Sequence, residues 1–205
     1  MRQFGTPRAP ACYRPPVTSA RQRSILEAAL RLAHRYGPTK TTVADIAREA
    51  RVGVGSVYLE FPSKAAILGA ISRHVHGQVL EAERRALGST GTPDARLCEA
   101  LRARFDAFVT LARGPHGPEL FHCARCAAIH DAHAEFRARE QVLFAEFLGA
   151  AADAFRVTNP SLTARLLLRA HAAYAPPLLF RTEPERLREE LQPLHDLLLA
   201  GLRRR

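Results

Sequence analysis

The sequence lacks several features that would place it in other classes of protein. It has no N-terminal run typical of a secretory signal and no stretch approaching about 18 uncharged apolar residues, so we expect neither export nor a membrane span. The cysteines Cys12, Cys98, Cys123 and Cys126 are unevenly spaced and give no disulfide framework. We therefore expect a cytoplasmic protein with no membrane partner.

The sequence also lacks the residue groupings that carry common enzyme chemistry. It contains no Gly-rich phosphate loop, no nucleophile with a neighbouring base and no helix with paired carboxylates for a metal ion. No alternating pattern typical of a β-strand reaches a useful length. These absences predict an all-α protein that is not an enzyme and needs no cofactor.

Positive charge is concentrated in the N-terminal part of this 205-residue chain. Residues 1–80 contain 12 Lys and Arg against 4 Asp and Glu, whereas residues 81–205 contain 18 against 16. Most of the net charge of +10 therefore lies in the first 80 residues, as expected of a segment that faces a polyanion. A role in solubility alone would explain the total charge but not its uneven distribution.

The pattern of apolar residues divides the chain into three parts. Residues 1–20 contain four prolines and three arginines, which predicts a disordered basic arm. Helical spacing then predicts an N-terminal domain over 21–80. Its first three helices are expected over 21–36, from Val43, and over Val54–Phe61. A fourth helix, capped by Ser63, carries the apolar stripe Ile67, Ile71, Val75 and Val79.

The remainder, residues 81–205, is predicted to be a helical ligand-binding and dimerisation domain. After a loop over 88–93, periodicity predicts five more helices, near 97–112, 118–129, 133–157, 161–174 and 184–202. The whole chain is thus expected to hold about nine helices.

The segment Val43–Phe61 has the form of a helix-turn-helix. Two short helices, separated by a tight break and preceded by a longer helix in a basic segment, form the homeodomain-like arrangement that places a recognition helix in the DNA major groove. The pieces Thr41-Thr42, Asp45-Ile46-Ala47, Gly55-Ser56-Val57-Tyr58 and Phe61-Pro62-Ser63-Lys64 occur in this order, and residues 21–80 resemble the tetracycline-repressor (TetR) family of bacterial regulators. The resemblance implies a sequence-specific DNA-binding transcriptional regulator, with repression or activation left open.

Two positions differ from the family pattern. Arg51 stands where the family usually has Gly in the turn, and Gly53 stands where it usually has a Ser or Thr cap. An arginine in a left-handed turn costs roughly 1–2 kcal/mol, and Gly is a weaker cap than Ser by a few tenths of that unit.

The chemistry of the motif assigns roles on double-stranded DNA. We expect the hydroxyls of Ser56 and Tyr58 to reach phosphates and Gly55 to let the backbone approach closely. Lys64 and Thr42 stand at helix N-termini that could bind a phosphate, and Val54 and Leu59 offer apolar contact to thymine methyl groups. The complete predicted DNA-binding set is Thr42, Gly53, Val54, Gly55, Ser56, Tyr58, Leu59 and Lys64. A packed Tyr58 and a merely solvated Lys64 are the alternatives.

The resemblance also implies a ligand cavity among the C-terminal helices, for an unknown small-molecule effector that would release a repressor from its operator. Aromatic residues with one histidine are the candidates for its lining: Phe105, Phe108, Phe121, Phe144, Phe147, His171 and Tyr174. The alternative is that these side chains simply form the core, with His171 a satisfied core histidine.

Cysteine and histidine residues gather in one segment. Cys123, Cys126, His130 and His133 would share a face if they lay on one continuous helix, and thiolate with imidazole suits zinc. A helix that begins near 130–133 would break that face. Because the long spacer of a zinc finger is also absent, we favour buried thiols and predict no metal site.

The last predicted helix carries a stripe of leucines, Leu187, Leu191, Leu194, Leu198 and Leu202. A helix-turn-helix protein commonly pairs two recognition helices on a palindromic operator. The stripe is therefore predicted to form a homodimer, with the preceding helix completing a four-helix interface as the resemblance also implies. The alternative is that the stripe packs on its own domain.

Overall fold

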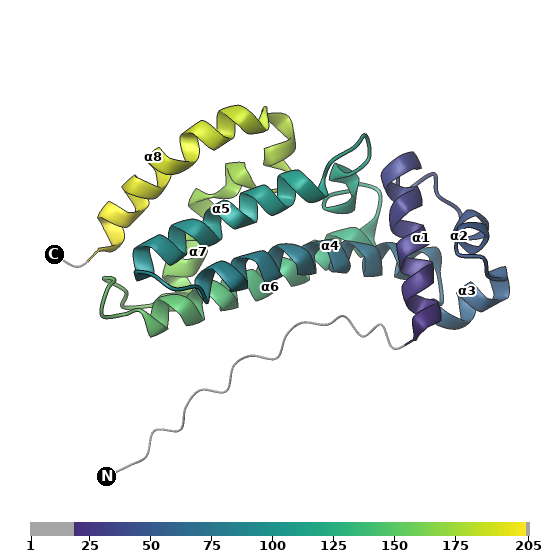
Figure 1. The fold of residues 1–205 in the computed structure, drawn as a ribbon, viewed down its shortest axis with the longest axis horizontal. Helices are drawn as coiled ribbons and strands as arrows, with labels where there is room; N and C mark the ends of the chain where they lie inside the picture. Colours follow the sequence, from purple (N-terminus) through teal and green to yellow (C-terminus); the bar gives the residue numbers. More distant parts are fainter. Residues whose placement is uncertain (1–18, 204–205) are drawn as a thin grey trace, which may run out of the picture.

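The computed structural model describes residues 19–203, and this part of the chain is helical throughout (Figure 1). Eight α-helices and three short 3₁₀ turns follow one another, and an isolated bridge joins Phe155 to Arg203. The predicted all-α class is confirmed. The expected basic arm lies outside the described residues except for its last two positions, Ser19 and Ala20, which begin the first helix.

Three helices form the N-terminal domain, at the right of Figure 1: α1 (Ala20–Tyr36), α2 (Val43–Glu49) and α3 (Val54–Glu60). The side chain of Ser19 caps α1 by accepting a hydrogen bond from the backbone N–H of Gln22 at 2.9 Å. The three-helix arrangement predicted from the sequence is therefore present.

A small apolar core holds these three helices together. Each contributes a fully buried side chain, Ile25 from α1, Ile46 from α2 and Val57 from α3, and these pack with Phe61 and Ile67. Burial of one such side chain contributes about 1.5–3 kcal/mol to stability. The core thus fixes the angle between α2 and α3 and leaves their other faces in solvent.

Helix α4 (Lys64–Leu87) belongs to both halves of the molecule. The side chain of Ser63 starts it by accepting a hydrogen bond from the backbone N–H of Ala66 at 3.1 Å. The helix packs against α1 and also against α5 and α6, and its predicted apolar stripe is buried (Figure 1). The expected domain boundary near residue 80 therefore lies inside one continuous helix.

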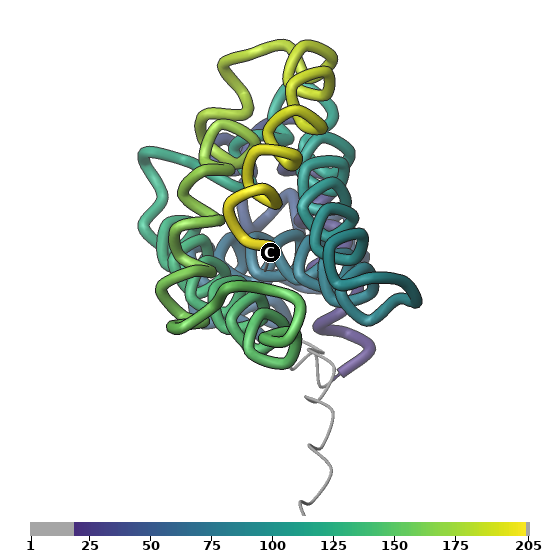
Figure 2. The backbone as a smooth tube through the Cα atoms, turned by 90° about the vertical axis from the view of Figure 1, so that its left-hand side faces the viewer, coloured from purple at the N-terminus to yellow at the C-terminus, as the bar shows by residue number. Residues whose placement is uncertain are grey.

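Four further helices complete the C-terminal domain: α5 (Pro93–Leu111), α6 (Ala127–Ala150), α7 (Pro160–Ala170) and α8 (Pro184–Leu202). Figure 2 views this bundle from the end opposite the N-terminal domain, with α8 in yellow between α7 in green and α5 in teal. The 3₁₀ turns lie in the connections, at Pro118–Leu120, Ala172–Tyr174 and Leu178–Arg181.

The connection between α5 and α6 differs from the prediction of a helix over 118–129. It contains only the short 3₁₀ turn and then runs irregularly to Cys126. Gly117 lies against the end of α5, where a Cβ would be 2.2 Å from the carbonyl oxygen of Ala112. The chain folds back tightly on the end of α5, which is why the described residues hold eight α-helices instead of about nine.

Two later helices end earlier than predicted. Helix α6 stops at Ala150 and not at 157, because Phe155 turns into the core and the N–H of Arg156 donates to the carbonyl of Leu202 at 2.7 Å. Helix α7 stops at Ala170, where the fully buried His171 begins the connection to α8. After α6 a tertiary hydrogen bond replaces continued helical bonding, whereas the N–H of His171 still donates to the carbonyl of Leu167 at 3.1 Å.

Candidate functional site

The turn between α2 and α3 has the geometry expected of a helix-turn-helix. Arg51 has φ 56°, the left-handed conformation, and it is the one residue other than glycine with a positive φ among residues 19–203. Gly53 follows as the N-cap of α3, without a side-chain cap. The expected strain at Arg51 is therefore present.

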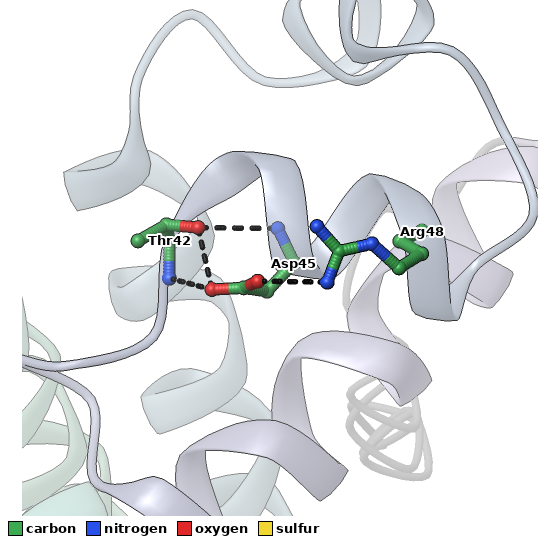
Figure 3. A network of polar contacts seen from close by, with 3 residues as sticks. All are labelled: Thr42, Asp45 and Arg48. Atoms are coloured by element: carbon green, nitrogen blue, oxygen red, sulfur yellow. Dashed lines mark hydrogen bonds and ion pairs between the residues drawn. The ribbon is translucent and has the colours of Figure 1, made fainter.

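A network of three polar side chains fixes the start of α2 (Figure 3). The hydroxyl of Thr42 accepts from the N–H of Asp45 at 3.1 Å and donates to its carboxylate at 2.5 Å, and this carboxylate also accepts from the N–H of Thr42 at 3.2 Å. Arg48 lies 3.3 Å from the same carboxylate. The hydrogen bonds from Thr42, with the charge of Arg48, lower the pKa of Asp45 below its usual value. Thr42 and Asp45 thus form a capping box at the start of α2.

Helix α3 presents large side chains to solvent that the core does not use. Tyr58 is 52% exposed, Leu59 83% and Val54 44%, whereas Val57 between them is fully buried. Gly53 and Gly55 are exposed and Ser56 is half-buried. An apolar surface of this kind on a seven-residue helix has no role in folding, so it is available for a partner.

Two of the predicted contact residues have further roles that the sequence did not reveal. The Nζ of Lys64 donates to the carbonyl of Thr39 at 2.7 Å, which brings the N-terminus of α4 beside the loop that leads to Thr42. A Cβ on Gly55 would meet nothing within 4 Å, so the fold itself leaves space there. Arg51 and Lys40 are also exposed near these helix ends, and the sequence reasoning did not include them.

The aromatic residues proposed for a ligand cavity lie in two parts of the core. Phe105, Phe108, Phe121 and Tyr174 belong to the larger apolar cluster, whereas Phe144 and Phe147 belong to a second cluster at the far end of the bundle. His171 is fully buried against Tyr174, with ring centroids 5.2 Å apart.

A cavity of about 320 Å³ does lie in this domain, but at another place. It opens between α6, α7 and the segment 172–178, and none of those seven residues lines it. Its polar wall is formed by Arg104, His133, Arg137, Glu140, Gln141, Arg165 and Arg169. A larger hollow of about 650 Å³ lies between α4 and α5, where Glu81, Glu99 and Asp106 occur together with Arg85.

A buried ionic network forms the inner side of the smaller cavity. The Nε of Arg104 lies 2.5 Å from Oε1 of Glu140 and 3.4 Å from Oε1 of Glu83, and all three side chains are almost completely buried. Burial, together with the nearby carboxylate of Glu140, raises the pKa of Glu83 well above its usual value. Of the buried groups in the network, Glu83 is thus the one whose protonated form burial favours.

Four histidines of this domain are buried or half-buried, and His133 lines the same cavity. Burial lowers the pKa of His76 to about 3, that of His171 to about 3 and that of His133 to about 4. The Nε2 of His76 lies 3.1 Å from Nδ1 of His133, which joins α4 to α6. Neither ring nitrogen of His171 or His195 has a hydrogen-bond partner within the described part of the chain. Burial lowers the pKa of His195 as well, so all four rings favour the uncharged form at neutral pH.

The cysteines and histidines considered for zinc do not share a helical face. Cys123 and Cys126 are buried and precede α6, whereas His130 and His133 lie within it. In the range 19–203 no group of three or more His, Cys, Asp or Glu side chains is arranged to hold a metal ion.

The leucine stripe of α8 faces the core of its own chain. Leu187 and Leu191 are buried, and Leu194, Leu198 and Leu202 pack partly against the two apolar clusters. The exposed leucines of this region are instead Leu197 of α8 and Leu162 and Leu166 of α7. None of the helices described here has the length and apolar character to cross a membrane.

The sequence reasoning did not identify three arginines that line the cavity of about 320 Å³, Arg137, Arg165 and Arg169. One signal for them exists, because Arg165 and Arg169 are four residues apart and so share one face of α7. Arg137 and Arg104 come from other helices, and only the folded structure brings them to the same cavity.

Comparison with known proteins matches the N-terminal part of the chain to a family. Residues 25–71 match the family described as bacterial regulatory proteins, tetR family. The HTH-type transcriptional regulator BetI of Brucella anthropi is 31% identical over 87 residues, which cover 42% of this chain and 45% of BetI. The matched region thus spans less than half the length of that curated relative.

Solved structures extend the likeness in fold to most of the chain. A transcriptional regulator from Cytophaga hutchinsonii has a TM-score of 0.70 at 20% identity, covering 91% of this chain and 100% of that one. The fatty acid degradation regulator FadR from Bacillus halodurans has a TM-score of 0.64 at 19% identity, with 91% and 98% covered. FadR from Bacillus subtilis, solved in complex with stearoyl-CoA, has a TM-score of 0.63 at 17% identity, with 87% and 98% covered. The N-terminal segment thus matches bacterial regulatory proteins of the tetR family and has their helix-turn-helix geometry, and most of the chain shares the fold of these solved regulators.

Proposed function

We propose that the protein is a cytoplasmic, homodimeric transcriptional repressor that binds a palindromic operator through α3 and leaves it when a small molecule binds the C-terminal domain. The observation that carries the proposal is the surface of α3. Tyr58, Leu59 and Val54 are exposed on a short helix whose orientation is fixed by the buried Val57. A rigid helix with unused apolar and hydroxyl groups, in the basic half of the chain, suits insertion into the major groove.

The proposed DNA contacts follow from the positions of the side chains. Ser56 and Tyr58 would bind phosphates through their hydroxyls, and Val54 and Leu59 would contact thymine methyl groups. Support for a role of Gly55 comes from the open space around it, which would let the DNA backbone approach. Thr42 and Lys64 would bind a phosphate near the neighbouring N-termini of α2 and α4.

The first experiment is selection of bound genomic fragments, followed by affinity measurements on the selected operator. We expect Tyr58→Phe and Ser56→Ala each to weaken operator binding several-fold, because each removes one phosphate contact. Tyr36→Phe is the matched control, since Tyr36 is a similarly exposed tyrosine that lies outside this surface. Unchanged affinity in both test variants would contradict the assignment of α3.

We propose that the dimer forms through the exposed faces of α7 and α8. Leu197 is 74% exposed, and Leu162 and Leu166 are exposed four residues apart on α7. Two such helices from each subunit would form a four-helix interface, in which the buried Leu187 and Leu191 support α8 from behind.

Sedimentation tests this interface. The double variant Leu166→Glu with Leu197→Glu is expected to be a folded monomer that binds the operator weakly, because both changes lie on exposed positions. The control Val142→Glu alters an exposed residue of α6 and should remain a dimer. A double variant that still sediments as a dimer would show that the interface lies elsewhere.

A further inference from the structure

Three arginines at the cavity of about 320 Å³ lack counter-ions. Arg137 of α6 and Arg165 and Arg169 of α7 line it, and within the described residues none of them forms an ion pair or hydrogen bond with a carboxylate. The larger hollow between α4 and α5, by contrast, contains charges of both signs. Arg165 and Arg169 carry like charges four residues apart on one helix face, which destabilises the pair unless an anion binds them.

The inner wall of the cavity adds a buried donor. Arg104 is 4% exposed and directs Nε and Nη2 to Glu140, while its Nη1 has no hydrogen-bond partner among residues 19–203. A buried guanidinium N–H group without an acceptor is costly, and a ligand oxygen would satisfy it. This group is independent of the three exposed arginines and favours the same kind of ligand.

The charges of the cavity do not cancel. Among the residues that line the cavity, Glu140 compensates Arg104. His133 is neutral because burial lowers its pKa to about 4. The three remaining arginines therefore give the lining of the cavity a net charge of about +3 at neutral pH, counting one unit for each guanidinium.

The other wall of the cavity is apolar and limits the size of a ligand. Leu168 of α7, Leu178 and the pair Pro176-Pro177 line it. The volume of about 320 Å³ is at the lower end for small-molecule sites and equals that of roughly ten water molecules in the liquid. A compact ligand with one anionic end and a short apolar body fits both walls.

We propose that this cavity binds a small organic anion, a carboxylate or a phosphate monoester with a short apolar chain, whose charged end is held by Arg165 and Arg169. The planar guanidinium groups supply paired N–H donors for such an oxyanion, and Leu168 and Leu178 pack against the apolar chain. This inference rests on the proposed function, because it names the chemical class of the effector.

The cavity wall is also in contact with α4, the helix that continues into the DNA-binding domain. Glu140 reaches α4 through Arg104 and Glu83, and His133 reaches it through His76. An anion that draws Arg104 away from Glu140 would therefore change contacts along α4. This connection predicts that the anion lowers the affinity for the operator.

Binding can be measured on the full-length protein without DNA. The probes are octanoate, octyl phosphate and the uncharged octanamide, titrated by calorimetry at up to millimolar concentration. We expect at least one of the two anions to bind about tenfold or more tightly than octanamide, because the amide lacks the charge-assisted hydrogen bonds. A preference between octanoate and octyl phosphate would tell a carboxylate effector from a phosphate effector.

Variants place the binding site. Arg165→Gln with Arg169→Gln changes only exposed side chains and should reduce anion affinity about tenfold or more. The control Arg125→Gln removes an exposed arginine outside the cavity and should leave the affinity unchanged. The proposal is wrong if octanamide binds as well as the anions, if neither anion binds, or if the double variant retains wild-type affinity.

Operator binding separates this inference from the proposed function. An anion that binds the cavity without weakening the operator complex would refute its role as effector, while DNA binding would stand. A wild-type protein that selects no DNA would refute the proposed function. The measured anion affinities would still show whether the cavity binds a small organic anion.

Discussion

The N-terminal domain and the C-terminal bundle bury different kinds of side chain. In the first, the buried core is apolar apart from Thr41, whose hydroxyl donates to the carbonyl of Gly37 at 2.9 Å. In the second, Glu83, Arg104 and Glu140 are buried together with several histidines. The first domain therefore keeps its functional groups on the outside, and the second keeps ionisable groups inside, next to a cavity.

This difference teaches where each domain can bind a partner. A rigid apolar core is a suitable support for a surface that must match the regular shape of DNA. Buried charges are weak contributors to stability, because desolvation offsets most of their attraction. Their presence in the bundle suits a domain whose internal contacts are to change when a ligand binds.

The largest effect should follow from breaking the buried network. Arg104→Ala leaves the buried carboxylate of Glu140 without its counter-ion and is expected to lower the free energy of unfolding by about 3–5 kcal/mol. Arg102→Ala, which removes a neighbouring arginine with a half-exposed ion pair, should cost at most about 1 kcal/mol. Equal losses for the two variants in denaturant titrations would show that the network is not buried.

The next effect concerns pH and distinguishes the bundle from the N-terminal domain. Burial lowers the pKa of His171 to about 3, so its contribution to stability is fully present above the unfolded value near pH 6.5 and is lost as the pH falls below it. Lowering the pH from about 6.5 to about 5.5 should cost wild type about 1 kcal/mol more than His171→Phe.

Because burial raises the pKa of Glu83, this group makes the protein more stable as the pH falls, opposite to His171. Both proteins contain Glu83, so its contribution cancels when wild type is compared with His171→Phe. His130→Gln alters an exposed histidine and serves as the control. Parallel stability curves for wild type and His171→Phe between these pH values would mean that His171 is not held neutral by burial.

A smaller effect should come from the strained turn of the N-terminal domain. Arg51→Gly relieves the left-handed conformation and is expected to raise stability by about 0.5–1 kcal/mol, after the entropy cost of glycine. Ala50→Gly at the preceding position, with φ −77°, should lower it. The thermal unfolding of both variants measures these changes. If Ala50→Gly raises the stability and Arg51→Gly does not, the strain does not lie at Arg51.

The smallest effect on stability is expected for the outer face of α3. Leu59→Gln should change the free energy of unfolding by less than about 0.5 kcal/mol, because this side chain is 83% exposed, yet it should weaken operator binding. The buried neighbour Val57→Ala should instead lower stability by about 1 kcal/mol or more. A large loss of stability in Leu59→Gln would contradict the conclusion that the outer face of α3 does not stabilise the domain.

Features that depend on residues close together in the sequence could be predicted. The capping box at Thr42 and Asp45, the left-handed turn at Arg51 and the apolar stripe of α4 each involve neighbours within one or a few helical turns. Local hydrogen bonds and the helical repeat determine them, so the helix-turn-helix and its exposed residues were evident from the pattern alone.

Only the tertiary structure decided which faces meet in the C-terminal domain. The pattern shows that α8 has an apolar stripe but not that Leu187 and Leu191 pack on their own chain, and it gives no sign that Gly117 turns the chain back on α5. The arginine-lined cavity combines Arg104, Arg137 and Arg165 from three helices. Such contacts depend on how helices far apart in the sequence pack together, and helical periodicity specifies only that a face is buried, not against what.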